Sequence, residues 1–426
     1  MSATMRSLAE VLPSDAFESV RTPAGEAPAG SPRQGPGRVP ESVVRPGSTE
    51  EVAAVLAWAT REGIGVLPVA SGSRAAPVSG EGAYVVLSTR RLSGIDIYEP
   101  ADLTLTARAG TPFRVVDDAL GAEGQWAPFD PPRVNERSIG GLVGSGESGP
   151  LWMGYGELRN HVLGATVVTG DGRTLRLGGR VVKNVAGYDL LKAVVGSRGT
   201  LAVLTSVCVR AFPRPAIDRV LVLRGSSVGA LLDAAMGVGT APMLPVSSVL
   251  ANRIGDGAEK RGAALVVRLH GARSTVDADQ AALERHIGAA FETIGDDGFG
   301  AEASRAHALL TTIRDRGATD AVVLDVSARP SRLREVLSAL ARLDADALVA
   351  DTYGGRIRVG MRELDRPRVH AARQAIEGLG GALRVRHAAG NETDQVQGSG
   401  PSDDETRLTD RLRGIFDPAG VFWPAR

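Results

Sequence analysis

The sequence is poor in cysteine, lysine and aromatic residues, and it has no excess of either charge. Its 426 residues include one cysteine, Cys208, and 49 basic residues balance 49 acidic ones. One cysteine can form no internal disulfide and no cluster for zinc or an iron–sulfur centre. Aromatic residues make up 4% of the chain, too few for a base-stacking surface, and no basic block is dense enough to bind nucleic acid. Nucleic acid is therefore not an expected partner.

Long apolar runs are also missing. No stretch of 18 apolar residues occurs, and the N-terminus lacks the basic-then-apolar layout of a signal peptide. The sequence therefore predicts a cytoplasmic protein without direct membrane insertion, which would meet a membrane only through a complex. At 426 residues, two domains are expected, each large enough for its own core.

The first half of the chain shows signals for alternating helices and strands. Residues 1–37 are expected to be a flexible segment, because Pro, Gly and Ala dominate from residue 22 onward, and order is expected to begin near Val43. Ser48 and Glu51 have capping-box spacing and precede a helix that Gly63 can end. Further strands are expected over residues 64–69, 84–88, 95–98 and 103–109, with a hairpin over residues 162–177.

The rest of the first domain shows one clear helix signal, one long segment without a period, and one alternating segment. Thr111 and Pro112 would supply the N-cap and the first position of a helix through residue 120. Residues 126–156 have no clear period, and a loop of that length in a compact domain is usually functional. Cys208 lies in an alternating segment, which predicts a buried strand residue and not a nucleophile.

The pattern changes after Val220. Strands are expected over residues 264–270, 321–328, 347–351, 356–361 and 383–387, with helices over residues 275–287, 331–343 and 367–379. This order resembles a ferredoxin-like β-α-β-β-α-β layer with insertions. We therefore expect a first domain over residues 38–215, a second over residues 216–412, and a tail over residues 413–426 whose aromatic residues pack back on the first domain.

Residues 144–149 contain the spacing G-x-G-x-x-G. A dinucleotide-binding Rossmann site needs a strand directly before this motif and a helix that starts inside it. Neither pattern is present, so a Rossmann site is not expected. The alternative is that the small residues let backbone amides and hydroxyls approach a ligand.

Residues 69–74 are a better candidate for binding an anion. They read Val-Ala-Ser-Gly-Ser-Arg at the end of an expected strand. Consecutive small residues can point several backbone N–H groups inward as a nest for phosphate. Such turns are common and often empty, so this signal is weak when taken alone.

Residues 179–190 and 196–203 form the most informative segment. Lysine occurs three times in the chain, and Lys183 and Lys192 both lie here, beside Asn184 and Tyr188. Glycines on either side would let the backbone approach a large ligand closely. The alternative is a solvent-exposed turn ahead of a helix. Two small-residue loops and this segment on one domain make a large dinucleotide a plausible ligand.

No metal site or hydrolase nucleophile is expected. The six histidines are scattered without metal-ligand spacing, and no serine lies in a nucleophile elbow.

The order of these motifs resembles the FAD-binding domains of the vanillyl-alcohol oxidase type, also called PCMH-type. Among these, the chain looks most like the FAD-binding E subunits of bacterial glycolate oxidases. K-N-V-A-G-Y-D-L at residues 183–190 and F-D-P-A-G-V-F-W-P at residues 416–424 carry the match most specifically. The resemblance covers residues 38–215 and the extreme C-terminus. It implies an α+β fold, in which a PCMH-type FAD-binding domain of two subdomains precedes a ferredoxin-like α/β cap.

The resemblance implies non-covalent FAD, because the first loop lacks the histidine that links flavin in some relatives. It places the first loop at the pyrophosphate, a second region beside the flavin ring and ribityl chain, and a strand at the adenine end. Two positions depart from the family pattern: Ala70 and Ser71 stand in a usual glycine triplet, and Glu147 replaces a small residue. The implied cofactor-binding residues are Val69, Ala70, Ser71, Gly72, Ser73, Arg74, Asp130, Pro131, Ser138, Gly140, Gly141, Ser145, Ser148, Gly149, Gly199, Thr200, Ala202 and Val203.

The second domain lacks the histidine motifs with which catalytic relatives bind a metal and take the substrate proton. The resemblance therefore implies a subunit of a glycolate oxidase-like complex that oxidises a small 2-hydroxy acid, with a companion catalytic flavoprotein and an iron–sulfur subunit. Lys183, Asn184 and Tyr188 are the candidates near the flavin, although no catalytic residue is assigned. Two alternatives are a stand-alone flavin dehydrogenase or oxidase that uses His387 or Arg362, and a scaffold subunit without working flavin.

Overall fold

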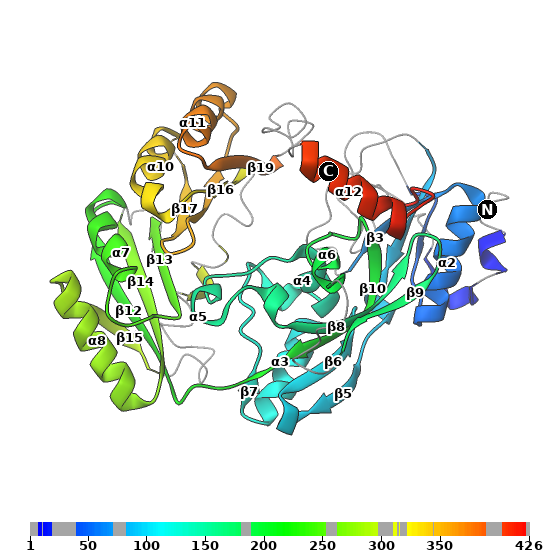
Figure 1. Cartoon of the computed structure of the whole chain (residues 1–426), viewed down its shortest axis with the longest axis horizontal. Coiled ribbons are helices and arrows are strands. Elements are labelled where there is room, and N and C mark those ends of the chain that lie inside the picture. Colours follow the sequence, from blue (N-terminus) through cyan, green and yellow to red (C-terminus); the bar gives the residue numbers. More distant parts are fainter. Residues whose placement is uncertain are drawn as a thin grey trace.

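The computed structural model describes residues 7–10, 12–18, 40–70, 82–179, 189–252, 262–296, 310–312, 315, 322–343, 345–388 and 403–422. Its two domains lie side by side, and the C-terminal helix returns to the first of them (Figure 1). None of the helices among these residues is both long and apolar enough to cross a bilayer.

The first domain begins with a four-stranded sheet in the order β1-β2-β4-β3. Its strands are β1 (Phe17–Glu18), β2 (Ser42–Val44), β3 (Gly65–Val69) and β4 (Tyr84–Ser88), of which β2, β4 and β3 run parallel. Helix α2 (Thr49–Glu62) packs against it and has the expected ends. The Glu51 N–H donates to Ser48 Oγ over 3.1 Å, and Gly63 ends the helix with a φ of 64°.

The prediction that order begins near Val43 is wrong for the described residues before residue 19. Leu8, Leu12 and Ala16 are buried in the same core as Trp58 of α2. The Trp58 indole N–H donates to Ser7 Oγ over 2.9 Å. Burial of these three apolar side chains stabilises the packing of this segment on α2.

A five-stranded antiparallel sheet, in the order β5-β6-β10-β8-β9, forms the rest of the first domain. Its strands are β5 (Ile95–Glu99), β6 (Thr104–Arg108), β8 (Val162–Thr169), β9 (Thr174–Gly178) and β10 (Ala202–Arg210). Cys208 is buried on β10, as the alternation predicts. Helix α3 (Phe113–Ala122) starts one residue later than expected, with Pro112 as its N-cap. The Thr111 hydroxyl instead bonds the backbone of Gly94 and Arg108.

Residues 126–156 contain helices that the sequence did not reveal. Helix α4 (Ile139–Ser145) has a capping bond from the Gly141 N–H to Ser138 Oγ, and α5 (Trp152–Tyr155) is a single turn. The glycines of α4 lower its helix propensity, but packing requires one of them, since a Cβ on Gly140 would lie 2.6 Å from that of Ala109. The two-stranded pair of β7 (Gln125–Trp126) and β11 (Phe212–Pro213) adjoins this region.

The second domain is one eight-stranded sheet in the order β15-β12-β14-β13-β17-β18-β16-β19. It consists of two β-α-β-β-α-β units, where a single unit was expected. Repeat 1 contains β12 (Ile217–Gly225), α7 (Leu232–Val238), β13 (Ser247–Asn252), β14 (Ala263–Gly271), α8 (Arg273–Ile287) and β15 (Glu292–Gly295). Repeat 2 contains β16 (Val322–Ser327), α10 (Leu333–Leu340), β17 (Ala347–Asp351), β18 (Arg356–Met361), α11 (Arg366–Gly378) and β19 (Ala382–Ala388).

The repeats join through antiparallel pairing of their second strands, β13 and β17. Helices α7, α8, α10 and α11 cover one face of the sheet, and the opposite face is turned toward the first domain (Figure 1). We call this opposite face, where it meets the first domain, the junction.

The C-terminal helix α12 (Asp403–Phe416) leads back to the first domain (Figure 1). Phe416 is buried against the five-stranded sheet, and Phe422 forms a parallel bridge with Val66 of β3. The Asp417 carboxylate accepts 2.9 Å bonds from the N–H groups of Val421 and Phe422, which fixes the turn between these contacts.

Candidate functional site

Close backbone contacts bring together segments of the first domain that are far apart in the sequence. A Cβ on Gly141 would lie 3.2 Å from that of Ala70, and a Cβ on Gly199 would lie 3.2 Å from that of Pro68. The end of β3 therefore touches both α4 and the turn before β10. These are three of the segments to which the sequence assigned cofactor binding.

Two further glycines complete this arrangement. A Cβ on Gly146 would lie 2.7 Å from the Cα of Gly196, and one on Gly149 would lie 1.9 Å from the Asp130 carbonyl oxygen. Gly146 has a φ of 61°, which suits glycine. Gly144 and Gly146 lie at the end of α4 and not at its start, which is the reverse of a Rossmann motif.

Several predicted contact groups hold the first domain's own backbone. At the start of α4, the N–H groups of Ile139 and Gly140 donate to Thr111 and Ala109. The Ser148 hydroxyl accepts a 3.0 Å bond from the Leu158 N–H. These groups are therefore engaged by other groups of the first domain in the structure.

The remaining predicted residues fall into two groups. Asp130 accepts two 3.2 Å bonds from the Leu151 N–H, Thr200 Oγ donates to the Ser197 carbonyl, and Ala202 and Val203 are buried in the core. Pro131 is buried and Val69 is half-buried. Outside the described residues lie Ser71, Gly72, Ser73, Arg74, Lys183, Asn184 and Tyr188, whose roles stay predictions.

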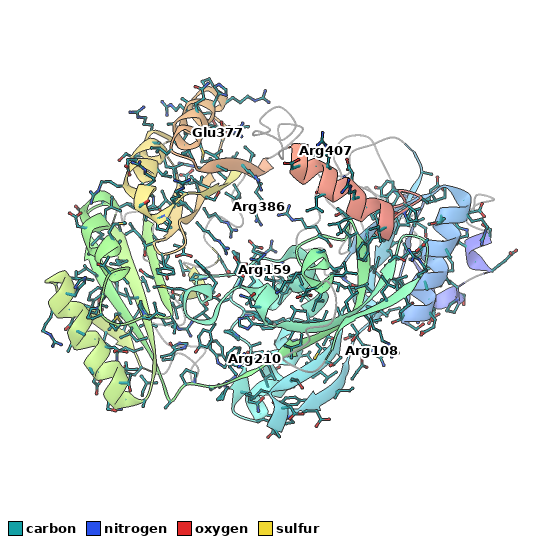
Figure 2. All side chains as sticks on the ribbon, viewed as in Figure 1. Arg108, Arg159, Arg210, Glu377, Arg386 and Arg407 are labelled. Atoms are coloured by element: carbon teal, nitrogen blue, oxygen red, sulfur yellow. The ribbon has the colours of Figure 1, made fainter. Side chains whose placement is uncertain are left out.

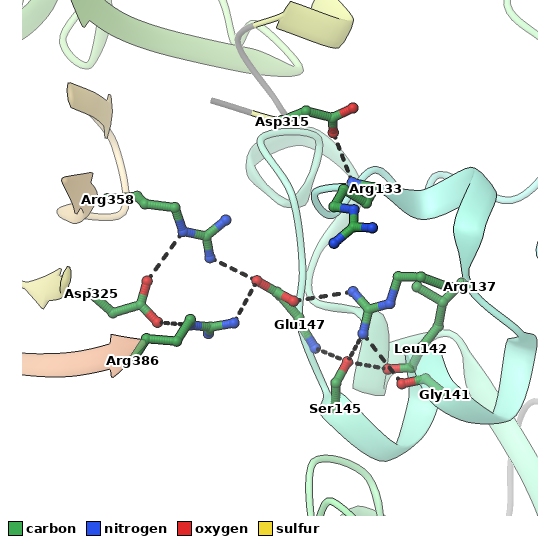
Figure 3. Close-up of polar contacts among 10 residues, drawn as sticks. All are labelled: Arg133, Arg137, Gly141, Leu142, Ser145, Glu147, Asp315, Asp325, Arg358 and Arg386. Carbon is green, nitrogen blue, oxygen red and sulfur yellow. Dashed lines mark hydrogen bonds and ion pairs between the residues drawn. The ribbon is translucent and has the colours of Figure 1, made fainter. Parts of the chain in front are cut away.

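Glu147 connects the first domain to repeat 2 across the junction (Figure 3). Its Oε1 accepts from Arg358 Nη2 at 2.7 Å and from Arg386 Nη1 at 3.1 Å, and its Oε2 accepts from Arg137 Nη1 at 3.1 Å. Asp325 on β16 accepts from the Nε of both Arg358 and Arg386. Arg386 lies between the two halves of the molecule (Figure 2).

Burial and charge act in opposite directions on these arginines. Burial lowers the pKa of Arg137, although Glu147 partly opposes it. Burial also lowers the pKa of Arg358, but Asp325 and Glu147 outweigh it and the net pKa is raised. Partial desolvation and the nearby charge of Arg386 lower the pKa of Arg198 at the rim. Arg137, Arg358 and Arg198 remain cations at neutral pH, because an arginine pKa starts above 12.

Repeat 1 meets the first domain through a different set of groups. Asp218 accepts from both Nε and Nη2 of Arg268, and its Oδ1 lies 3.0 Å from His270 Nε2. His270 Nδ1 lies 2.7 Å from the Tyr155 hydroxyl of α5. Burial is the main cause that raises the Tyr155 pKa to about 12 and lowers the His270 pKa. This set is therefore a neutral imidazole and phenol beside a compensated ion pair.

Two further contacts join the first domain to repeat 2 at the junction. The Trp152 indole N–H donates to Asp351 at the end of β17, and Arg356 pairs with Glu157. A Cβ on Gly354 would lie 2.1 Å from the Trp152 ring, so the indole lies directly over that glycine.

The two residues considered for a stand-alone enzyme do not form a site in the described structure. The Arg362 side chain is 85% exposed and pairs with Asp346 at 3.0 Å, which places it in solvent. The backbone of His387 lies on β19, and its side chain lies outside the described residues. Among the side chains that the structure describes, no group of three or more His, Cys, Asp or Glu could hold a metal ion.

The sequence did not identify four arginines of β18 and β19 as site residues. Arg356 and Arg358 on β18, and Arg384 and Arg386 on β19, alternate with apolar residues at a period of two. The signal in the sequence is the alternation itself, because it places the arginines together on the face of each strand that is turned away from the core.

Comparison with known proteins assigns the first domain. Residues 40–178 match the family described as an FAD binding domain. The glycolate oxidase subunit GlcE of Escherichia coli (strain K12) is 44% identical over 140 residues, which cover 33% of this chain and 39% of GlcE. D-lactate dehydrogenase of Archaeoglobus fulgidus is 35% identical over 206 residues, which cover 47% of this chain and 44% of that protein. The chain thus spans about two fifths of the length of these relatives.

A solved structure extends the similarity of fold to both domains. Alkyldihydroxyacetonephosphate synthase superposes with a TM-score of 0.65 at 16% sequence identity, over 91% of this chain and 76% of that one. At this identity the likeness shows the α+β fold alone.

The first domain fits FAD in two respects. Segments within and directly after the match to the FAD binding domain meet closely at Gly141, Gly146, Gly149 and Gly199, where an added Cβ would crowd the neighbouring segment. Three arginines also neutralise Glu147, so its carboxylate presents no uncompensated negative charge to an anionic cofactor. Residues 40–178 match the FAD binding domain family, and FAD is the cofactor.

Proposed function

We propose that the chain is an FAD-dependent oxidoreductase subunit that acts in the oxidation of small 2-hydroxy acids, with glycolate as the first substrate to test. The observation that carries the proposal is the FAD binding domain at residues 40–178, together with its similarity to a glycolate oxidase subunit and a D-lactate dehydrogenase. FAD would be bound non-covalently, because residues 69–74 include no histidine.

Oxidation of a 2-hydroxy acid removes a hydride from carbon and a proton from the hydroxyl group. Bound FAD would supply the two-electron acceptor, and the protein would supply position and electrostatics. The first domain's glycine contacts would hold the cofactor's wall in place.

The described junction offers no suitable acceptor for the substrate proton. Glu147 is held by three arginines, and the Tyr155 hydroxyl has a pKa raised to about 12, mainly by burial. His270 is neutral but its two nitrogens face Asp218 and Tyr155. A companion subunit that carries the proton acceptor would complete the reaction. We therefore propose a complex with a companion catalytic flavoprotein and an iron–sulfur subunit that passes the electrons onward.

The first experiment is to purify the chain, add FAD, remove the excess and record the flavin absorbance. We expect a bound flavin band, and its absence would exclude the proposed function. Gly146→Ala should weaken FAD binding by about tenfold, because its Cβ would lie 2.7 Å from the Cα of Gly196 and would push the two segments apart. A tenfold loss corresponds to about 1.4 kcal/mol of binding free energy. Gly144→Ala is the matched control, since its Cβ would lie 3.8 Å from Leu204 Cδ1, an ordinary contact.

The second experiment is anaerobic reduction of the flavin by glycolate, D-lactate or D-2-hydroxyglutarate. We expect bleaching only after the companion subunits are added. Bleaching by the isolated chain would favour a stand-alone enzyme. A flavin band with no bleaching in either state would contradict a role in 2-hydroxy acid oxidation.

A further inference from the structure

Repeat 2 holds two arginines in a fixed orientation toward one point of the junction. Asp325 accepts from the Nε of Arg358 and the Nε of Arg386, so it fixes the plane of both guanidinium groups. Their Nη atoms then point away from Asp325 and meet at Glu147 Oε1 (Figure 3). Arg137 approaches the other oxygen of the same carboxylate from the first domain.

The cluster has more cations than carboxylates. Arg137, Arg358 and Arg386 face Glu147 and Asp325, and Arg198 at the rim adds a further positive charge. Guanidinium groups in a partly desolvated place attract anions strongly, because the local dielectric is lower than in water.

The two sides of the cluster differ in their access to solvent. The Arg137 side chain is 2% exposed, whereas those of Arg358 and Arg386 are 17% and 24% exposed. A small anion from solvent would therefore meet the arginines of repeat 2 first. Glu147 itself is 9% exposed and comes from a loop of the first domain.

We propose that Arg358 and Arg386, oriented by Asp325, form a binding site for a small carboxylate, and that Glu147 is an internal carboxylate that competes for this site. The contacts of Glu147 support the ligand class, because the same Nη groups bind a carboxylate in the structure. Arginine recognises carboxylates through several directed N–H donors, which makes such clusters selective for that group. Only the identification of this carboxylate with the 2-hydroxy acid substrate rests on the proposed function.

Competition sets the affinity that an added acid would show. While Glu147 occupies the arginines, an external carboxylate must displace it, and its apparent affinity falls by the fraction of time that the site is open. Displacing Glu147 would also release both ion pairs that it makes with repeat 2. The ligand would then bias the way the two domains meet.

Oxalate is the probe, because it is a rigid, redox-inert acid with two carboxylates. Its binding is measured by titration calorimetry at constant ionic strength, on protein stripped of flavin and on protein loaded with FAD. We expect weak binding to the wild type and about tenfold tighter binding to Glu147→Gln, which keeps the size of the side chain but removes its charge. Adding Arg386→Gln to that variant should abolish the gain.

Glu157→Gln is the matched control, because Glu157 pairs with Arg356 at the same junction but outside this cluster. It should bind oxalate as the wild type does. If Glu147→Gln does not fold, the increase in Tm that oxalate causes is compared between wild type and Arg386→Gln, and it should be lost in the variant.

Oxalate binding that is no tighter in Glu147→Gln than in wild type would overturn the proposal, as would tight binding that survives loss of Arg386. The proposed function fails separately, through a missing flavin band or missing bleaching by hydroxy acids. Tight oxalate binding by flavin-free Glu147→Gln would stand in either case.

Discussion

Each repeat of the second domain places an aspartate of its first strand opposite a basic residue of its third strand, but the two pairs differ in their surroundings. In repeat 1, Asp218 on the first strand lies opposite His270 on the third. In repeat 2, Asp325 on the first strand lies opposite Arg358 on the third. Both aspartates contact basic side chains on the face that meets the first domain, and each set reaches one residue there, Tyr155 or Glu147.

The two sets differ in burial and in charge balance. The Asp218 side chain is fully buried and its charge is compensated by Arg268, whereas the Asp325 side chain is 34% exposed and lies among excess arginines. Repeat 1 therefore acts as a fixed anchor, because removing one partner of its buried ion pair would strongly lower the stability of the fold. Repeat 2 keeps a cationic site that solvent can reach, which suits ligand binding.

The largest expected effect tests the anchor of repeat 1. Asp218→Ala removes the carboxylate that two nitrogens of Arg268 contact and leaves a buried cation. We expect a loss of about 3–5 kcal/mol in the free energy of unfolding, measured by urea denaturation. Asp233→Ala, which removes a 90% exposed carboxylate that pairs with Arg334, should change it by about 0.5 kcal/mol or less. Equal effects of the two substitutions would contradict the difference in burial.

A smaller effect is expected where the two repeats meet the first domain together. Gly354→Ala places a Cβ 2.1 Å from the Trp152 ring. The indole and its bond to Asp351 must shift, at a cost of about 1–3 kcal/mol. Thermal unfolding with Trp fluorescence reports both the stability and the Trp152 environment. Gly378→Ala is the control because its Cβ would meet nothing within 4 Å, and a similar loss in both variants would show that Trp152 is not the cause.

The anchor of repeat 2 should matter less for stability. Asp325→Ala should cost about 1 kcal/mol, because solvent screens a partly exposed pair and Glu147 still contacts both arginines. The same urea experiment checks this value beside Asp218→Ala. A loss as large as that of Asp218→Ala would mean that the two repeats are equivalent anchors.

Local signals in the sequence predicted the first domain better than the second. Helix α2 has a side-chain cap and a glycine stop within its own residues, so its ends could be read directly. Strands β12 and β13 were missed because both of their faces are buried and their residues do not alternate. The duplication also depends on the pairing of β13 with β17, about 100 residues apart, which no local pattern encodes.

The candidate site was predictable only on its first-domain side. Glu147 was noticed as a carboxylate where small residues are usual, but its partners Arg358 and Arg386 lie 211 and 239 residues further along the chain. The resemblance to FAD-binding domains implied that the cofactor segments contact the ligand. In the structure, Ser138 and Ser148 accept hydrogen bonds from backbone N–H groups instead. These bonds depend on the conformation of the loops, which residue type does not reveal.

The last prediction uses the residue that differs between the two aspartate pairs. Burial first, and the charge of Arg268 with it, lower the pKa of His270 despite Asp218, whereas Asp325 and Glu147 raise the pKa of Arg358, the residue opposite Asp325. The unfolded chain takes up a proton at His270 near its ordinary pKa of about 6.5, and the folded chain takes it up only at lower pH. The free energy of unfolding should therefore fall as pH falls through about 6.5.

His161, whose pKa burial also lowers, adds to this slope, whereas burial raises the pKa of Asp117 and Asp351 and so acts in the opposite direction at lower pH. The test therefore compares how much the free energy of unfolding changes between pH 7.5 and pH 5.5 in the wild type and in His270→Gln, measured by urea denaturation. The variant should lose less stability than the wild type over this interval. An unchanged slope would mean that the His270 pKa is the same in the folded and unfolded chain. A larger loss of stability in the variant than in the wild type would mean that Asp218 keeps the imidazole protonated in the folded state, and repeat 1 would then carry an excess of cations as repeat 2 does.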